Sequence, residues 1–204
     1  SEGTAGRWCI RTLVVWATRN HVSPPLTVGH RAIRSSRLLS HDDRNRLLRT
    51  CLTEVPDTLA YRVAAVLLLL YAQPLVRIVR LTTNQVFPSP TATFIRFGMS
   101  SADRTFVPEP FAALLRQHMT TRPNTRTVNT TGNPWLFPGR RAGRHVNADV
   151  VARRLRQIGI NPLGARNRSL RELVRQVPAP IVAAQLGYSP NVALKHAAMA
   201  AEPD

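Results

Sequence analysis

The sequence predicts a mainly α-helical fold with a small antiparallel β-ribbon, an α+β arrangement. Apolar residues recur at helical spacing over 40–52 and 59–71. Two strand-like segments, 93–97 and 104–107, are joined by a turn and can form a hairpin or part of a three-stranded ribbon. Helical patterns resume after this ribbon. The order of helices, ribbon and helices predicts the fold class.

The helices before the ribbon have recognisable beginnings. Ser40 precedes Asp42 and Asp43, which is typical of an N-cap followed by acids in the first turn. The helix over 59–71 is apolar enough to be expected at the centre of the core. Pro74 can open a third helix, which carries the apolar residues Leu75, Ile78, Val79 and Leu81.

Helix and loop signals alternate after the ribbon. Pro110 opens a helix that runs to about His118, and the polar stretch 120–133 has no apolar periodicity, so we expect a mobile loop there. The apolar segment 135–139 leads into a basic turn and a helix over about 147–158.

Two short helices are predicted near the end of the chain. Arg168 and Arg171 are three positions apart, which places both guanidiniums on one face of the first helix. The second helix occupies about 180–186, and Gly187 stands at the position that normally ends a helix.

The chain divides by composition into three parts. Residues 1–21 contain a loosely helical apolar pattern between Arg7 and Asn20 and are interpreted as an N-terminal helix, the remnant of an upstream domain. Residues 22–40 are rich in proline, serine and arginine and are interpreted as a basic linker. Residues 41–204 form the main domain.

The charge balance points to a polyanionic partner. The formal net charge is +17, and every cationic residue except Lys195 is an arginine, whose planar fork binds two phosphate oxygens at once. A GC-rich genome explains the preference for arginine over lysine but not the scarcity of acids. Cations are densest at Arg140, Arg141, Arg144, Arg153, Arg154, Arg156, Arg166, Arg168, Arg171 and Arg175.

Other classes of protein find little support in the sequence. Cys9 and Cys51 have no metal-ligand spacing and the histidines are scattered, so no metal and no cofactor is expected. The longest apolar run, 63–72, is too short to span a bilayer, and no signal peptide is visible. We expect a cytoplasmic, nucleoid-associated protein.

The closing segment resembles the active site of the tyrosine recombinase (phage integrase) family. Arg168-Ser-Leu-Arg171 is similar to the family's His-x-x-Arg, and Leu186-Gly187-Tyr188 is similar to its Leu-Gly-His, which precedes the nucleophilic tyrosine. The order of elements from about Ser40 onward also resembles the family's catalytic domain. The resemblance implies that fold, a double-stranded DNA partner, a role in DNA recombination or DNA integration, and assembly as an oligomer on DNA.

The resemblance assigns catalytic positions one by one. Arg171 matches the second arginine of the family, which stabilises charge on the phosphate. Pro74 stands in place of the first arginine, and Arg77 lies one helical turn further on. Arg168 stands at the position of the base, and Tyr188 at the position of the second histidine.

Several residues that the family's chemistry needs are missing. The hairpin has no lysine, and Arg104 in the hairpin cannot replace an acid because it does not release its proton. The nucleophile should stand near Ala197, but no tyrosine follows Tyr188, and the neighbouring His196 is interpreted as a helix residue. The candidate catalytic residues are therefore limited to Arg171, Arg168 and Tyr188.

The sequence thus predicts a DNA-binding protein that resembles a site-specific recombinase with a degenerate active site. The alternative is a non-enzymatic DNA-binding or architectural protein that uses the same basic surface, and an RNA-binding module is a third class that the charge permits. The predicted DNA contacts are Arg77, Arg140, Arg141, Arg144, Arg153, Arg154, Arg166, Arg168 and Arg171.

Overall fold

The computed structural model describes residues 13–14, 16–22, 24, 39–53, 57–89, 91–98, 103–122, 133–141 and 143–201. The chain divides into two compact units, 1–35 and 36–204. In the first unit, Leu13, Val14 and residues 16–19 are helical, and the rest of the predicted helix 7–20 lies outside the described residues except for Asn20, a turn residue. The predicted linker 22–40 is described only at its ends and at Pro24.

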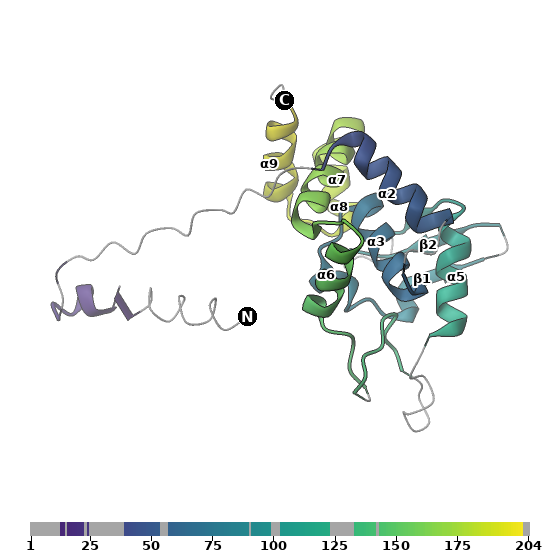
Figure 1. Ribbon diagram of the computed structural model, residues 1–204. Helices are drawn as coiled ribbons and strands as arrows, with labels where there is room; N and C mark the ends of the chain where they lie inside the picture. Colours follow the sequence, from purple (N-terminus) through teal and green to yellow (C-terminus); the bar gives the residue numbers. More distant parts are fainter. Residues whose placement is uncertain are drawn as a thin grey trace. The chain divides into compact units, whose positions relative to one another are not determined.

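The second unit consists mainly of helices around a small sheet, as Figure 1 shows. Its helices and strands, in chain order, are α2 (His41–Thr53), α3 (Leu59–Tyr71), α4 (Leu75–Ile78), the 3₁₀ turn η1 (Thr83–Gln85), β1 (Val86–Pro88), β2 (Thr93–Ile95), β3 (Thr105–Val107), α5 (Phe111–Thr121), α6 (Ala148–Gln157), α7 (Pro162–Gln176), α8 (Ala179–Leu186) and α9 (Pro190–Ala201). The predicted fold class is confirmed.

Helix α3 is the centre of this unit. Its residues 63–69 are all buried, and α2, α4, α5, α6 and α7 contact it. A helix that is apolar on all sides is stable only where other elements cover it on all sides. Helices α8 and α9 pack instead against α7 and against each other.

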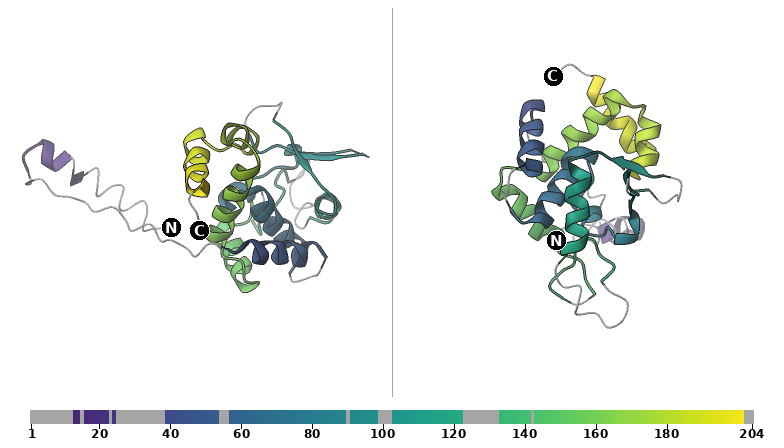
Figure 2. Two further views of the ribbon diagram at one scale, coloured as in Figure 1. Left: turned by 90° about the horizontal axis from the view of Figure 1, so that it is seen from above. Right: turned by 90° about the vertical axis from the view of Figure 1, so that its right-hand side faces the viewer.

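The three strands form an antiparallel sheet in the order β1-β2-β3. Thr93 pairs with Pro88 on one side and with Val107 on the other, and the rings of Phe94 and Phe106 lie 5.8 Å apart across the strands. Figure 2 shows this ribbon extending away from the helical body.

Local capping residues explain why several predicted bounds match the structure. Ser40 Oγ accepts a hydrogen bond from the Asp43 amide at 3.0 Å, and Asn147 caps α6 by accepting one from the Asp149 amide at 2.8 Å. Gly187 ends α8 with φ +69°, a left-handed conformation that glycine adopts without strain.

Three predicted elements differ from the structure. The helix that carries Arg168 and Arg171 is not short, because Asn161 caps it and it continues as a 15-residue helix. The third helix ends already at Ile78. Helix α5 continues to Thr121, so it takes up the start of the predicted loop, and 123–132 lie outside the described residues.

Candidate nucleic-acid interface

The candidate site is organised around the C-terminal end of α3. The last carbonyl groups of a helix have no partners within it and carry the negative end of the helix dipole. The Leu69 carbonyl accepts hydrogen bonds from Arg44 Nε at 2.9 Å and from Ser169 Oγ at 2.7 Å. The Ala72 carbonyl accepts one from the hydroxyl of Tyr188. Side chains from three other segments therefore converge on this helix end.

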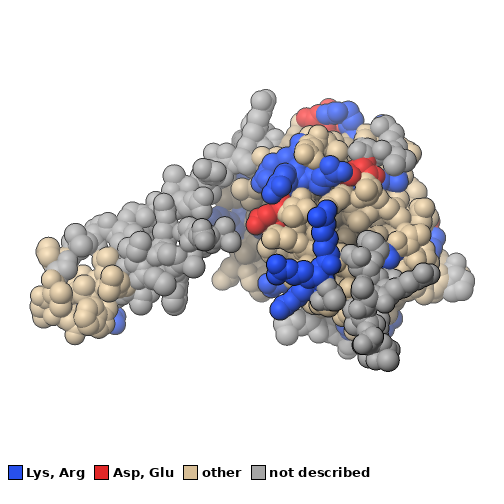
Figure 3. Space-filling view, turned by 60° about the horizontal axis from the view of Figure 1, so that its bottom comes forward, with Lys and Arg blue, Asp and Glu red and all other residues tan. Residues whose placement is uncertain are grey.

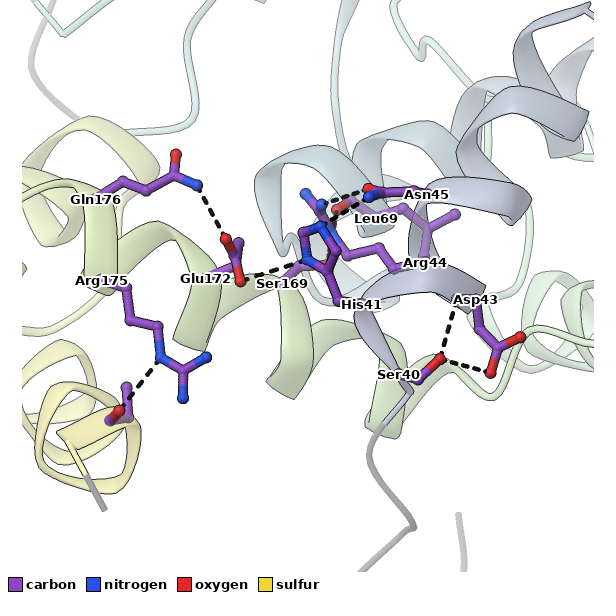
Figure 4. A network of polar contacts seen from close by, with 11 residues as sticks. Ser40, His41, Asp43, Arg44, Asn45, Leu69, Ser169, Glu172, Arg175 and Gln176 are labelled. Carbon is purple, nitrogen blue, oxygen red and sulfur yellow. Dashed lines mark hydrogen bonds and ion pairs between the residues drawn. The ribbon is translucent and has the colours of Figure 1, made fainter. Parts of the chain in front are cut away.

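Arg44 joins α2 to α7 below this end, as Figure 4 shows. It is buried, and its Nε also donates to Ser169 Oγ at 3.2 Å. Burial lowers the pKa of this guanidinium, the nearby charge of Glu172 raises it, and the charge of Arg168 lowers it. His41 lies 3.8 Å from Glu172, so a second contact links the same two helices.

Replacement of Ser169 by alanine is expected to lower the free energy of unfolding by about 1–2 kcal/mol. The change removes a fully buried hydroxyl that bonds both the Leu69 carbonyl and Arg44. Urea denaturation of Ser169→Ala, Arg44→Met and the double variant measures the effect and the coupling between the two residues. If the two single effects add without coupling, the hydroxyl and the guanidinium act independently.

The hydroxyl of Tyr188 is already engaged in a hydrogen bond. The hydroxyl donates to the Ala72 carbonyl, and the guanidiniums of Arg77 and Arg166 lie 5.6 and 5.7 Å from the centre of its ring. Burial raises the pKa of Tyr188, while the charges of Arg166 and Arg77 lower it. The net rise keeps the hydroxyl protonated, which is the opposite of what a nucleophile needs.

Arg77 lies at the rim of an open cavity of about 470 Å³. Its Nη1 donates to the Gly187 carbonyl at 2.6 Å, whereas Pro74, which precedes α4, carries no charge. The cavity opens beside α4 and the sheet and is lined in part by Gln73, Arg77, Arg80, Gln85, Phe97 and Gly98. The predicted Arg77 is thus placed next to the segment that carries Tyr188.

Arg168 and Arg171 have different neighbours although they are three positions apart. The charge of Arg168 acts on Arg44 of α2, whereas Arg171 Nη2 lies 3.6 Å from the sulfur of Met199 in α9. The charge at the position predicted for the base is therefore felt at α2, and the position predicted for the phosphate ligand contacts α9.

One turn carries Arg140, Arg141 and Arg144, three predicted DNA contacts, and we call it the basic turn. All three are exposed. The Gly139 amide donates to the Arg144 carbonyl at 2.7 Å, and the Trp135 side chain donates from Nε1 to the Gly143 carbonyl at 2.9 Å. These two bonds to backbone carbonyls hold the turn and use no guanidinium.

The two predicted DNA contacts on α6 differ in their interactions with the rest of the chain. Arg153 is exposed, whereas Arg154 forms an ion pair with Asp57 at 3.1 Å and lies 5.6 Å from the ring centre of Tyr61. Arg154 therefore fastens α6 to the start of α3. On the face shown in Figure 3, Lys and Arg side chains predominate over scattered acids.

The sequence did not indicate three sets of interactions that the structure shows. Arg44 and Ser169 are 125 positions apart, and nothing local marks their contact. His196 was interpreted as a helix residue only, yet the charges of Arg166 and Arg171 both act on it. In the hairpin, the Arg104 guanidinium lies over the ring of Phe87, 4.1 Å from its centre.

The described part of the chain contains no group of three or more His, Cys, Asp or Glu residues that could hold a metal ion. None of its helices is long and apolar enough to cross a membrane.

Comparison with solved structures identifies the fold. The XerA recombinase aligns with a TM-score of 0.58 at 17% identity, over 95% of this chain and 71% of its own. The XerH site-specific recombinase in its post-cleavage complex with the palindromic difH substrate aligns with a TM-score of 0.64 at 14% identity, over 96% of this chain and 63% of its own. A lambda integrase dimer bound to a COC′ core site aligns with a TM-score of 0.56 at 14% identity, over 96% of this chain and 60% of its own.

These comparisons concern the fold. No known protein family's sequence profile matches the chain, and no curated protein matches it. The chain spans between 60% and 71% of the length of the three structures named above. It has the fold of a tyrosine recombinase catalytic domain.

Proposed function

We propose that the chain binds double-stranded DNA through its cationic surface and does not cleave it through a tyrosine. The observation that carries the proposal is the exposed basic turn, in which three arginines are presented by a backbone that is held by other bonds. Arg153 and Arg77 add cations on neighbouring elements. Phosphate binding needs such cations and no proton relay.

The recombinase fold supports DNA as the polyanion. The XerH and lambda integrase structures are complexes with DNA. A net charge of +17 favours any polyanion, and the similarity in fold to these two DNA complexes favours duplex DNA among polyanions. The proposed role is DNA binding in DNA recombination or DNA integration. The alternative is an architectural role that uses the same basic surface. Assembly as an oligomer on DNA belongs to the same proposal.

Two features argue against cleavage through a tyrosine. The position that the resemblance assigns to the nucleophile holds Ala197. The hydroxyl of Tyr188 bonds the Ala72 carbonyl, and its pKa is raised by burial. A duplex nicked next to a candidate scissile phosphate is expected to give no covalent adduct; an adduct that disappears in Tyr188→Phe would contradict the proposal.

DNA affinity is expected to fall steeply with salt. Contacts to about five phosphates predict a loss on the order of 10²–10³-fold between about 50 mM and about 200 mM salt. Fluorescence anisotropy with a duplex of about 30 base pairs measures the slope. The double variant Arg140→Ala/Arg141→Ala is expected to reduce the slope of log affinity against log salt by about two.

The matched control removes the same charge from α2. Arg46 and Arg49 are exposed and line a surface with Asp42 and Asp43, so Arg46→Ala/Arg49→Ala is expected to change the slope little. Salt-independent binding, or equal effects of the two double variants, would remove the basic turn from the interface.

A further inference from the structure

Two helices bring a group of nitrogen-bearing side chains together. Helices α7 and α9 pack against each other, and Arg166 and Arg171 of α7 act electrostatically on His196 of α9. We call these three residues the α7–α9 cluster. The ring of Tyr188 lies beneath the Arg166 guanidinium, and Met199 contacts Arg171, so the two guanidiniums are fixed by neighbours that carry no charge.

No acid neutralises the α7–α9 cluster within the described residues. The ion pairs found there join His41 to Glu172, Arg46 to Asp43, Arg116 to Glu109 and Arg154 to Asp57. The Nε atoms of Arg166 and Arg171 and Nδ1 of His196 are buried, and no hydrogen-bond partner is found for them in the described structure.

Such an arrangement is incomplete without an anion. Buried donors without acceptors are unfavourable, and like charges held close together repel each other. An anion that enters between α7 and α9 would accept from the guanidiniums and remove the repulsion. The anion that the proposed function supplies is a phosphate group.

We propose that the α7–α9 cluster binds one backbone phosphate of DNA and that this binding is coupled to protonation of His196. The imidazolium then supplies a third charged donor to the phosphate. The coupling rests on the proposed function, because DNA is the source of the phosphate. It makes DNA affinity depend on pH through a single residue.

The direction of the effect follows from the surroundings of His196. Burial lowers its pKa, and the charges of Arg166, Arg171 and Lys195 lower it further. Without an anion the ring is therefore neutral near pH 7. A bound phosphate favours the imidazolium, so the pKa rises on binding and affinity increases as pH falls.

No other group in the cluster changes its charge in this range. The other charged groups that act on His196 are Arg166 and Arg171 of α7 and Lys195 of α9, and an arginine does not release its proton in proteins. The hydroxyl of Tyr188, which lies between α8 and α9, has its pKa raised by burial and stays neutral. A pH dependence that is lost with His196 therefore reports on His196.

The experiment measures binding of the full chain to a duplex of about 30 base pairs between about pH 8 and about pH 6 at constant ionic strength. Wild-type affinity is expected to rise by about tenfold, within the limit of about tenfold per pH unit for one proton. His196→Gln retains an N–H donor but cannot gain charge, so its affinity is expected to stay nearly constant. Arg166→Gln is expected to weaken binding at both ends of the range.

The matched control is His118→Gln, which removes a buried histidine of α5 whose pKa of about 4 keeps it neutral between about pH 8 and about pH 6, so the pH dependence should stay unchanged. If His196→Gln behaves like wild type, or if His118→Gln abolishes the pH dependence, the coupling is overturned. DNA binding without a His196-dependent pH effect contradicts this inference alone, whereas no DNA binding at any pH contradicts the proposed function.

A second measurement needs no variant. NMR titration of the His196 ring is done with the protein alone, with inorganic phosphate and with the duplex. The pKa of His196 is expected to rise with the duplex. A rise with inorganic phosphate only would show that the cluster takes free phosphate and would overturn the assignment to DNA; no rise with either would overturn the site.

Discussion

A Gly187→Ala variant is expected to lose about 3 kcal/mol of its free energy of unfolding. Gly187 has φ +69°, and a Cβ there would lie 2.7 Å from the Phe97 carbonyl oxygen and 3.2 Å from its carbon. The left-handed conformation costs an alanine about 1 kcal/mol, and the contact with β2's outgoing backbone adds about 2 kcal/mol because neither backbone can move freely.

Gly143 provides the control that separates these two contributions. It also has φ +69°, but no described atom lies within 4 Å of a Cβ built there. Gly143→Ala is therefore expected to cost about 1 kcal/mol. Chemical denaturation of both variants, followed by circular dichroism, measures the difference. If the two variants are equally destabilised, the close approach of Gly187 to the hairpin has no energetic consequence.

The location of Gly187 was predictable from the sequence, but its second role was not. The apolar run before it and the proline after it indicate a helix end, and the left-handed glycine confirms that interpretation. Its close approach to Phe97 depends on two segments about 90 positions apart in the sequence. Local signals describe helix ends well because the residues concerned are neighbours along the chain.

In the candidate site too, positions along the chain were predictable from the sequence, but contacts between distant segments were not. The sequence marked Arg171 and Tyr188 as important and marked the basic turn as a phosphate-binding segment. It did not indicate that the charge of Arg168 acts on Arg44, because a spacing of three residues fixes relative position on one helix but not the neighbours of that helix. The α7–α9 cluster was missed for the same reason: its members become a group only when two helices pack.

The start of the third helix was predictable from the sequence, but the contacts beside it were not. Pro74 has the conformation expected before a helix, so the prediction that it opens α4 is confirmed. The hydroxyl of Tyr188 and the guanidinium of Arg44 bond carbonyl groups at the end of α3, which the sequence could not reveal because these segments are far apart along the chain.

Lowering the pH from about 7 to about 4 is expected to reduce the free energy of unfolding by about 3 kcal/mol through His118 alone. This residue of α5 is 2% exposed, and its Nε2 lies 2.9 Å from the Leu136 carbonyl. Its pKa is lowered to about 4, mainly by burial, while the hydrogen bond to Leu136 raises it and the charge of Arg122 lowers it.

The sign follows from proton uptake. Between the unfolded pKa of about 6.5 and the folded pKa of about 4, the unfolded chain binds a proton that the folded chain does not, so stability falls as pH falls. Below the folded pKa both states are protonated, so the free energy of unfolding no longer changes with pH through His118. The difference of about 2.5 pKa units corresponds to about 3 kcal/mol.

His118→Gln tests this assignment directly. Glutamine can donate to the Leu136 carbonyl but takes up no proton, so the variant is expected to lose about 3 kcal/mol less than wild type over the same interval. Carboxylates and the repulsion among arginines contribute equally to both proteins and cancel in the comparison. If wild type and variant lose stability in parallel, His118 is not the group that titrates, and its burial does not suppress protonation in the folded chain.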